Sequence, residues 1–423
     1  MREMKDSGIE WLGEIPAEWK RKKIKNAVAL IGSGTTPAST CLQYYESEDV
    51  NWIQSGDIYG VDSKTSTLVS NAAVRSLSAL HVYNPDFIVI AMYGGSVGNI
   101  AISKIQACVN QACCCIQTDS QNDLKFMYYW IYMCKSDFLR ISEGGGQPNI
   151  SQSKIKNQYY MQPPLPEQRR IADFLDAKCA EIDALTADIQ TQIDTLEQYK
   201  RSVITEAVTK GLNPDVEMKD SGLKWIGKIP SSWNVMPNKY LMKKKKVICP
   251  VYKGEDILSL TMKGVIVRDL DAGGKMPTSF DGYQRLEPGN LLMCLFDIDV
   301  TPRCIGLIKQ AGLSSPAYSQ FALNDMGNAD YYCYYYTMLD NDKTLLHLAK
   351  NLRHSLTEDQ LGAISVIVPP VQEQKRIANF LDAKCEEIDK VIAAKIEQLA
   401  LIDEYKKSLI YEYVTGKKEV PAI

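Results

Sequence analysis

Two stretches of this 423-residue chain, about two hundred residues apart, have nearly the same sequence. Residues 166–183 read PEQRRIADFLDAKCAEID and residues 372–389 read QEQKRIANFLDAKCEEID, with fourteen of eighteen positions identical. A second pair precedes them: MKDSGIEWLGEIPAEW at 4–19 and MKDSGLKWIGKIPSSW at 218–233 match at ten of sixteen positions. Between the matching blocks lie two long regions that share little sequence. A duplication that keeps its ends and diverges in its middles predicts one frame that presents two different surfaces.

The repeated segments from Glu167 and Glu373 predict two long helices. Prolines at 163, 164 and 166 suit a helix start, and no Gly or Pro follows until Gly211 and Gly416. About forty residues correspond to a rod on the order of 60 Å. The apolar positions are Leu175, Ile182, Leu185, Ile189, Leu196, Tyr199 and Val203 in the first copy and Leu381, Ile388, Val391, Ile402, Tyr405 and Leu409 in the second. Because a lone helix would leave this stripe in water, we predict that the two helices form a coiled coil; separate packing of each helix on its own domain is the alternative.

The variable regions predict compact β-rich, mixed α/β domains. Turn-forming sequences are dense in both, and short apolar runs such as Phe87–Met92 and Leu291–Phe296 are typical of buried strands. The predicted fold class is α+β, with two such domains joined by two long helices in an internal pseudo-two-fold repeat. The predicted divisions are 1–162, 163–212, 213–368 and 369–423.

Composition argues against membrane, secretory and metal-site classes. The chain has no run of about eighteen apolar residues, and its first residues lack the apolar region of a secretory signal, so we predict a cytoplasmic protein without a membrane span. The twelve cysteines include three consecutive ones at 113–115, no CxxC occurs, and there are only three histidines. Buried free thiols are the expected state, and no metal site is predicted.

Enzyme signatures are missing from the sequence. The glycine-rich GSGTTP at 32–37 lacks the lysine of a phosphate-binding loop, and no D/N-P-P-aromatic motif of an amino-methyltransferase occurs. The string PDVEMK at 214–219 resembles a nuclease motif only in letters, because that chemistry needs its carboxylates on adjacent strands. We therefore predict a chain without catalytic residues.

With no catalytic motif in the sequence, we predict a role in binding, and the charge pattern indicates that the variable regions would contact a polyanion such as DNA. Residues 20–160 and 234–366 carry net charges of +3 and +1, whereas the repeated segments 167–209 and 373–415 carry −4 and −2. Basic runs suit phosphates, and Arg, Asn, Gln and Ser suit base edges. The predicted DNA-contact residues of the first region are Lys20, Arg21, Lys22, Lys23, Thr35, Thr36, Gln54, Ser55, Gln147 and Asn149. Those of the second are Lys243, Lys244, Lys245, Lys246, Ser259, Thr261, Arg268, Arg285, Arg303, Ser315 and Tyr318. For each residue alone, a solvated surface position is the alternative.

The quoted segments, together with WIQSGDI at 52–58 and GGGQPNISQSKI at 144–155, resemble the specificity subunit of Type I restriction-modification systems. The resemblance implies that each variable region is a target-recognition domain that reads one half of an interrupted double-stranded DNA sequence. It implies that the long helices form an antiparallel coiled coil, which sets the spacer between the half-sites. It also implies a non-catalytic chain that binds no cofactor itself.

The same resemblance implies the partners. Two modification subunits would methylate adenine N6 with S-adenosylmethionine, and motor-nuclease restriction subunits would use ATP and Mg²⁺. Two alternatives stay open: a coiled-coil scaffold that does not read DNA, and a self-sufficient DNA-modifying enzyme.

Overall fold

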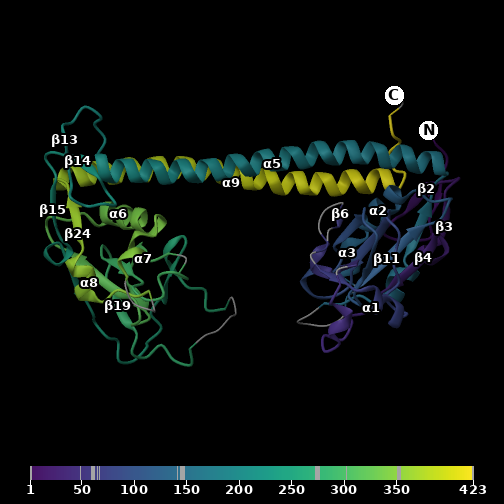
Figure 1. Cartoon of the computed structure of the whole chain (residues 1–423). Coiled ribbons are helices and arrows are strands. Elements are labelled where there is room, and N and C mark those ends of the chain that lie inside the picture. The colour runs from purple at the N-terminus through teal and green to yellow at the C-terminus, as the bar shows by residue number, and fades with distance from the viewer. Residues whose placement is uncertain are drawn as a thin grey trace. The chain divides into compact units, whose positions relative to one another are not determined.

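The computed structural model describes residues 2–47, 49–58, 62, 63, 65, 67–140, 142, 148–271, 277–301, 303–349 and 354–421. The chain divides into two compact units, each of which contains part of both long helices (Figure 1). Unit 1 consists of residues 1–188 and 397–423, and unit 2 consists of residues 189–396. Helices and strands occur in both, so the fold is α+β, as predicted. The predicted division into four segments stays a prediction.

Unit 1 is built on a five-stranded sheet. Its strands are β1 (Met4–Asp6), β2 (Glu14–Pro16), β3 (Lys20–Lys23), β4 (Val28–Ser33), β5 (Val50–Ile53), β6 (Asp62–Ser63), β7 (Leu68–Val69), β8 (Phe87–Ala91), β9 (Ile100–Ser103), β10 (Ala107–Val109), β11 (Cys113–Thr118) and β12 (Tyr159–Gln162). The large sheet has the order β4-β11-β8-β9-β6 and a smaller one has the order β10-β5-β7. Two further antiparallel pairs join β1 to β2 and β3 to β12.

Helices cover one face of the large sheet. The helices that contribute to unit 1 are α1 (Asn71–Ser76), α2 (Leu124–Met133), α3 (Lys135–Arg140), α4 (Gln152–Asn157), α5 (Leu165–Lys210) and α9 (Val371–Val414). Side chains alternate along β8: Ile88 and Ile90 join the core under α2 and α5, whereas Phe87 and Val89 join a second cluster on the opposite face. The predicted buried strand at 87–92 is therefore confirmed.

Unit 2 repeats this plan with a four-stranded sheet. Its strands are β13 (Met218–Asp220), β14 (Lys228–Pro230), β15 (Asn234–Pro237), β16 (Met242–Lys245), β17 (Leu258–Thr261), β18 (Gly264–Val267), β19 (Gln284–Leu286), β20 (Leu291–Met293), β21 (Ile305–Leu307), β22 (Gly312–Ser314), β23 (Ser319–Leu323) and β24 (Ser365–Val368). The sheet has the order β16-β23-β20-β21, and the remaining strands form two-stranded pairs. The predicted strand at 291–296 is confirmed as β20, although it is shorter.

The core of unit 2 is filled by tyrosines of one helix. The additional helices are α6 (Ala329–Asn341), α7 (Thr344–Leu348) and α8 (Glu358–Ala363). Tyr331, Tyr332, Tyr335 and Tyr336 of α6 are completely buried. The Tyr331 hydroxyl donates to the carbonyl of Val208 at 2.8 Å, which ties α6 to α5. A buried tyrosine needs such a partner because its hydroxyl loses water on folding.

The repeated tryptophans anchor the start of each long helix. Trp19 Nε1 donates to Glu167 Oε2 at 3.1 Å, and Trp233 Nε1 donates to Glu373 Oε2 at 3.0 Å. Both indole rings are completely buried. The glutamates at the helix starts therefore bind an indole, in addition to the favourable position of a negative charge at a helix N-terminus.

The glutamines that follow anchor the variable regions to the same helices. Gln168 Oε1 accepts from the backbone N–H of Asp123 at 2.8 Å, and Gln374 Oε1 accepts from that of Asn328 at 2.7 Å. Each amide nitrogen donates to the carbonyl five residues earlier, at 2.9 and 2.8 Å. Asp123 and Asn328 are the N-caps of α2 and α6, so the repeated glutamines fix where these helices begin.

In each unit α5 and α9 lie side by side and run antiparallel (Figure 1). In unit 1 the rings of Phe174 and Tyr413 are 4.5 Å apart and Lys406 Nζ lies 2.6 Å from Asp183 Oδ1. In unit 2 the matching ion pair joins Lys200 Nζ to Asp389 Oδ2, also at 2.6 Å. The two pairs occupy equivalent positions of the sequence repeat, which differ by 206 residues.

The predicted apolar stripe is wrong at four of its thirteen positions. Leu175, Ile182 and Ile189 are buried as predicted, but Leu185, Tyr199, Val391 and Tyr405 are 46, 49, 42 and 58% exposed. Cys179 is buried and Thr186 is half-buried between these three positions, and the buried Ile193 follows Ile189, so the stripe steps by four and then three residues. Leu185, Tyr199 and Tyr405 each stand immediately before a residue that is less exposed, namely Thr186, Lys200 or Lys406, so apolar character alone did not identify the buried face.

None of the helices within the described residues is long and apolar enough to cross a membrane.

Candidate nucleic-acid interface

The first basic run lies in β3, where it pairs with β12. The Arg21 Nη1 atom donates to the carbonyl of Ser7 at 2.9 Å, and its guanidinium lies 5.3 Å from the ring centre of Tyr159. Arg21 therefore ties the MKDSG segment to the variable region. Lys20 is exposed and Lys22 and Lys23 are half-buried, so these lysines keep their charge near solvent.

Two predicted polar segments of unit 1, at residues 35–36 and 54–55, meet at a third segment that was not predicted. The Thr36 hydroxyl donates to Gln111 Oε1 at 2.6 Å, and the Gly34 N–H donates to the carbonyl of Asn110 at 3.3 Å. The Asn110 N–H in turn donates to the carbonyl of Ile53, which precedes Gln54 and Ser55. A Cβ at Gly34 would lie 1.6 Å from the carbonyl oxygen of Val109, so only glycine allows this approach. Gln111 belongs to the cluster but was absent from the sequence prediction.

The remaining predicted pair of unit 1 is only partly described. Asn149 forms a β-bridge with Tyr93, and Gln147 lies outside the described residues. Tyr93 is 43% exposed at the end of the buried strand β8. The Gly94 N–H donates to the carbonyl of Pro148 at 2.9 Å, which holds the two loops together.

Two lysines of the second basic run have carboxylate partners. Lys244 pairs with Glu358, and Lys245 Nζ lies 2.5 Å from Glu287 Oε2. Lys243 and Lys246 are exposed. Because neither of these two forms an ion pair with a described residue, we expect them to contribute more to phosphate binding than Lys244 and Lys245.

Several predicted residues of unit 2 support the local structure. The Thr261 hydroxyl accepts from Lys263 N at 3.1 Å and donates to the Gly264 carbonyl at 3.0 Å, which closes the β17–β18 turn. Arg285 Nη2 lies 3.2 Å from Glu255 Oε1. Ser259 lies in β17, and the Ser315 hydroxyl accepts from the N–H of Ala317 at 3.3 Å.

An aromatic pair lies at the end of the central strand of unit 2. The rings of Phe296 and Tyr318 stack with centroids 6.1 Å apart and an interplanar angle of 26°. Burial raises the pKa of the Tyr318 hydroxyl, and the positive charge of Arg268 opposes this rise, which places Arg268 near the pair. Phe296 is 37% exposed and occupies the position that Tyr93 occupies in unit 1, after the matching strand. The sequence prediction did not include Phe296 or Tyr93. The sequence did offer a signal for them, because an aromatic residue stands at the end of each buried apolar run.

Arg303 is one of the two predicted arginines that are half-buried. Its Nη1 atom donates to Asn341 Oδ1 at 3.0 Å and lies 3.3 Å from Asp340 Oδ2. Its side chain is 16% exposed, and that of Asp340 is 2% exposed. Arg303, Asp340 and Asn341 line an open groove of about 1090 Å³.

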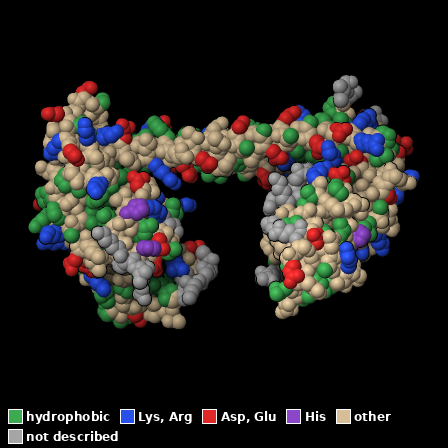
Figure 2. Space-filling view, in the orientation of Figure 1, with side chains coloured by type: hydrophobic (Ala, Val, Ile, Leu, Met, Phe, Trp, Pro, Cys, Tyr) green, Lys and Arg blue, Asp and Glu red, His purple; other side chains and the backbone are tan. Residues whose placement is uncertain are grey.

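The three consecutive cysteines have buried thiols whose pKa is raised by burial. Burial raises the pKa of the Cys113 and Cys114 thiols to about 12, which keeps them neutral and weakly nucleophilic. Within the part of the chain that the structure describes, no three His, Cys, Asp or Glu side chains are grouped to hold a metal ion. Acidic side chains recur on the visible face of the long helices (Figure 2).

The Type I restriction modification DNA specificity domain family matches residues 16–195 and 317–398, more than half of the chain. This chain belongs to that family. It is a specificity subunit of a Type I restriction-modification system. The match includes the variable region of unit 1 and the first parts of both long helices, but residues 196–316 lie outside it. The second basic run, Arg268 and Arg303 of this specificity subunit are therefore in the part with no family match.

Individual relatives agree with the family. A Methanocaldococcus jannaschii protein named as the specificity subunit of the type I restriction enzyme MjaX is 23% identical over 441 residues, which cover 97% of this chain and 96% of that protein. The Escherichia coli EcoR124I/EcoR124II specificity subunit is 25% identical over 222 residues, which cover 51% of this chain and 46% of that protein. A solved chain from work on assembly and conformational transition of the type I R-M system has a TM-score of 0.69 at 13% identity, covering 96% of this chain and 99% of that one. This last likeness shows that the specificity subunit shares its fold.

Proposed function

We propose that this specificity subunit reads an asymmetric two-part sequence in double-stranded DNA, with each unit contacting one half. One observation carries the proposal: the same contacts to the long helices hold two variable regions whose polar surfaces differ. The Trp–Glu and glutamine contacts recur in both units, whereas the polar groups presented above them differ in kind and position. Equal frames with different contact chemistry suit two different half-sites.

The long helices act in this proposal as the spacer. Support comes from the antiparallel contacts inside each unit and from the equivalent ion pairs Asp183–Lys406 and Lys200–Asp389. We infer an antiparallel coiled coil along both helices, related by the internal pseudo-two-fold repeat. The half-sites would then lie about one turn of DNA apart, near 34 Å.

The exposed apolar residues of the helices provide a docking surface for two modification subunits. Leu185 and Tyr199 of α5 have equivalents in Val391 and Tyr405 of α9, and all four are exposed. Large apolar side chains repeated on a solvent face are typical of partner contacts. The chain itself is non-catalytic in this proposal and acts in the cytoplasm. The modification subunits supply S-adenosylmethionine chemistry, and motor-nuclease subunits use ATP and Mg²⁺.

Domain replacement in the complete complex tests this function. Residues 20–160 are exchanged for the corresponding region of another specificity subunit, and methylated adenines are mapped in the host genome. We expect one half of the methylated sequence to change and the other half to stay, because each half is read by one unit. The matched exchange of residues 234–366 should change only the other half.

Two results would favour the alternatives. An unchanged methylation pattern after both exchanges would indicate a scaffold that does not read DNA. Methylation or cleavage by the purified chain alone would indicate a self-sufficient enzyme.

A further inference from the structure

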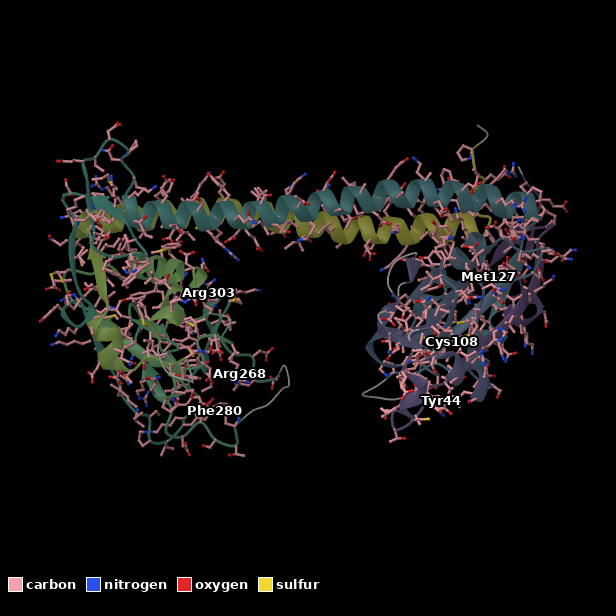
Figure 3. All side chains as sticks on the ribbon, in the orientation of Figure 1. Tyr44, Cys108, Met127, Arg268, Phe280 and Arg303 are labelled. Carbon is pink, nitrogen blue, oxygen red and sulfur yellow. The ribbon has the colours of Figure 1, made fainter. Side chains whose placement is uncertain are left out.

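The groove that contains Arg303 lies in unit 2, between the long helices and the variable region. Residues of α5, α6, α9, β18 and β21 line its volume of about 1090 Å³. The lining is mixed in charge: Lys200, Arg201, Lys263 and Lys309 contribute cations, and carboxylates come from Glu197, Asp330, Asp382, Glu386 and Asp389, the last of which is paired with Lys200. Figure 3 shows Arg303 on the same side of unit 2 as Arg268.

The guanidinium of Arg303 is fixed at one end only. Both of its hydrogen bonds to described residues leave from Nη1, toward Asp340 and Asn341. Asp340 is fixed in turn, because its Oδ2 also accepts from the N–H of Cys304 at 3.1 Å. Nε and Nη2 donate to none of the described residues. These two donors form one edge of the planar fork, and a ligand in the groove can use them.

Unit 1 has a different residue at the equivalent strand position. The β8–β9 and β20–β21 registers align Ile100 with Ile305, so Gly98 is the equivalent of Arg303. A Cβ at Gly98 would lie 3.1 Å from Cγ of Lys135, so the lysine stem lies close to this backbone.

The equivalent helix position carries the opposite charge. Tyr129 and Tyr334 each donate to an aspartate of a long helix at 2.8 Å, and six residues later stand Lys135 and Asp340. Lys135 Nζ donates to Asn99 Oδ1 at 2.9 Å. Unit 1 thus carries a flexible ammonium here, and unit 2 carries a restrained guanidinium with an anion behind it. The two units therefore present different groups to a ligand at equivalent positions of the repeated fold.

We propose that Arg303 reads a guanine base in the half of the target contacted by unit 2, and that Asp340 is the positioning residue for its guanidinium. The inference rests on the proposed function and names one of its contacts. A phosphate clamp needs charge, and Asp340 offsets the charge of Arg303. Guanine O6 and N7 need two donors in a fixed plane, and the contacts of Nη1 hold that plane.

The test uses the complete complex with its modification subunits and a duplex DNA library that is randomised through both half-sites. Methylation rates of library members are compared for wild type, Arg303→Gln and Arg303→Lys. We expect each variant to lose about tenfold to a hundredfold of its preference for guanine at one position, because the bidentate pair is removed. Arg303→Lys keeps a cation beside Asp340, so the fold is retained while the fork is removed. Lys309→Gln, which changes another cation of the same groove, should keep the guanine preference.

The positioning role has its own readout. Asp340→Asn should reduce the same guanine preference, and the double variant Arg303→Gln/Asp340→Asn should lose no more preference than Arg303→Gln alone. If Asp340 were only structural, Asp340→Asn would lower the thermal unfolding temperature and leave the base preference unchanged.

Three outcomes would overturn the proposal. An unchanged preference in Arg303→Lys and Arg303→Gln would remove Arg303 from base reading. Equal weakening on every sequence, with a smaller dependence on salt, would identify a phosphate contact. Relaxation in the half-site read by unit 1 would place Arg303 on the wrong half. In each case the domain replacement can still succeed, so failure here is distinguishable from failure of the proposed function.

Discussion

Gln168 and Gln374 show at the residue scale why the doubled EQ motif needs an amide beside the carboxylate. Both side chains are completely buried, and each uses its oxygen and its nitrogen on backbone groups. A glutamate at this position would lack the donor and would bring a charge into the core. The glutamate before each glutamine accepts a hydrogen bond from an indole, and this bond is only partly buried.

Gln374→Ala should lower the free energy of unfolding by about 1–3 kcal/mol, because the half-buried Asn328 N–H and the carbonyls of Met326 and Pro369 lose their partner. Gln168→Ala should have a similar effect in unit 1. Urea denaturation measures the loss, and hydrogen exchange assigns it to the first turn of α6 or of α2. The exposed Gln198→Ala on α5 should stay within about 0.5 kcal/mol of wild type. Loss of protection at both helices from one substitution would contradict independent anchors.

The second basic run makes a separate prediction at this scale. Lys243→Gln with Lys246→Gln should weaken DNA binding on all sequences and reduce the slope of log K against log salt by about one for each phosphate that is no longer neutralised. Lys244→Gln with Lys245→Gln should change the slope less, since Glu358 and Glu287 already offset those charges. Filter binding over a salt series measures both. An effect confined to the specific target would mean that these lysines read bases.

At the scale of the element, neighbouring residues of the long helices have different roles. One residue faces the other helix, and the residue before it faces solvent. The positions that face the other helix include Cys179 and Thr186 and the lysines at 200 and 406, whose stems are partly buried while their amines pair with aspartates. The larger apolar side chains that precede Thr186 and Lys200, Leu185 and Tyr199, face solvent. The helices therefore expose apolar surface that is not buried by the contact between them.

Tyr199→Ser with Tyr405→Ser should weaken association with the modification subunits by about tenfold or more, because exposed aromatic residues dominate many protein interfaces. Circular dichroism should show an unchanged helix content, since the two side chains are 49 and 58% exposed. Analytical ultracentrifugation of the mixed subunits measures the association. Gln198→Ser is the matched polar control on α5. Full association of the double variant would place the docking surface elsewhere.

At the scale of the whole molecule, the duplicated frame and the unlike contacts assign different tasks to different parts of the chain. The anchors are equivalent in both units, so a change in one contact surface need not disturb the fold that carries it. This is the physical basis for exchanging one recognition region and keeping the other.

Insertion of one heptad into both long helices, at matching points of the helix pair, should change the spacer and preserve both half-sites. Seven residues add about 10 Å, which corresponds to roughly three base pairs of DNA. Mapping of methylated adenines should show the same half-sites at a new separation or no methylation. Altered half-sites would mean that the helices do not set the spacer. Insertion into only one helix is the control, and it should disrupt the pairing of the helices.

The sequence by itself determined the repeat, the long helices, the α+β class and the family. These follow from local patterns, such as helical periodicity, turn residues and repeated blocks, that are visible along a linear chain. The exact face of the helix pair was not determined in this way: burial at Cys179 and exposure at Leu185 depend on where the other helix lies.

Only the tertiary structure decided which polar residues act together. Trp19 meets Glu167 across 148 residues of chain, and Arg303 meets Asp340 across 37. No local pattern encodes such pairs, because they arise from the path of the chain through strands and helices. The same path distinguishes Arg21, which bonds the backbone of its own frame, from Arg303, which keeps one edge of its guanidinium for a ligand.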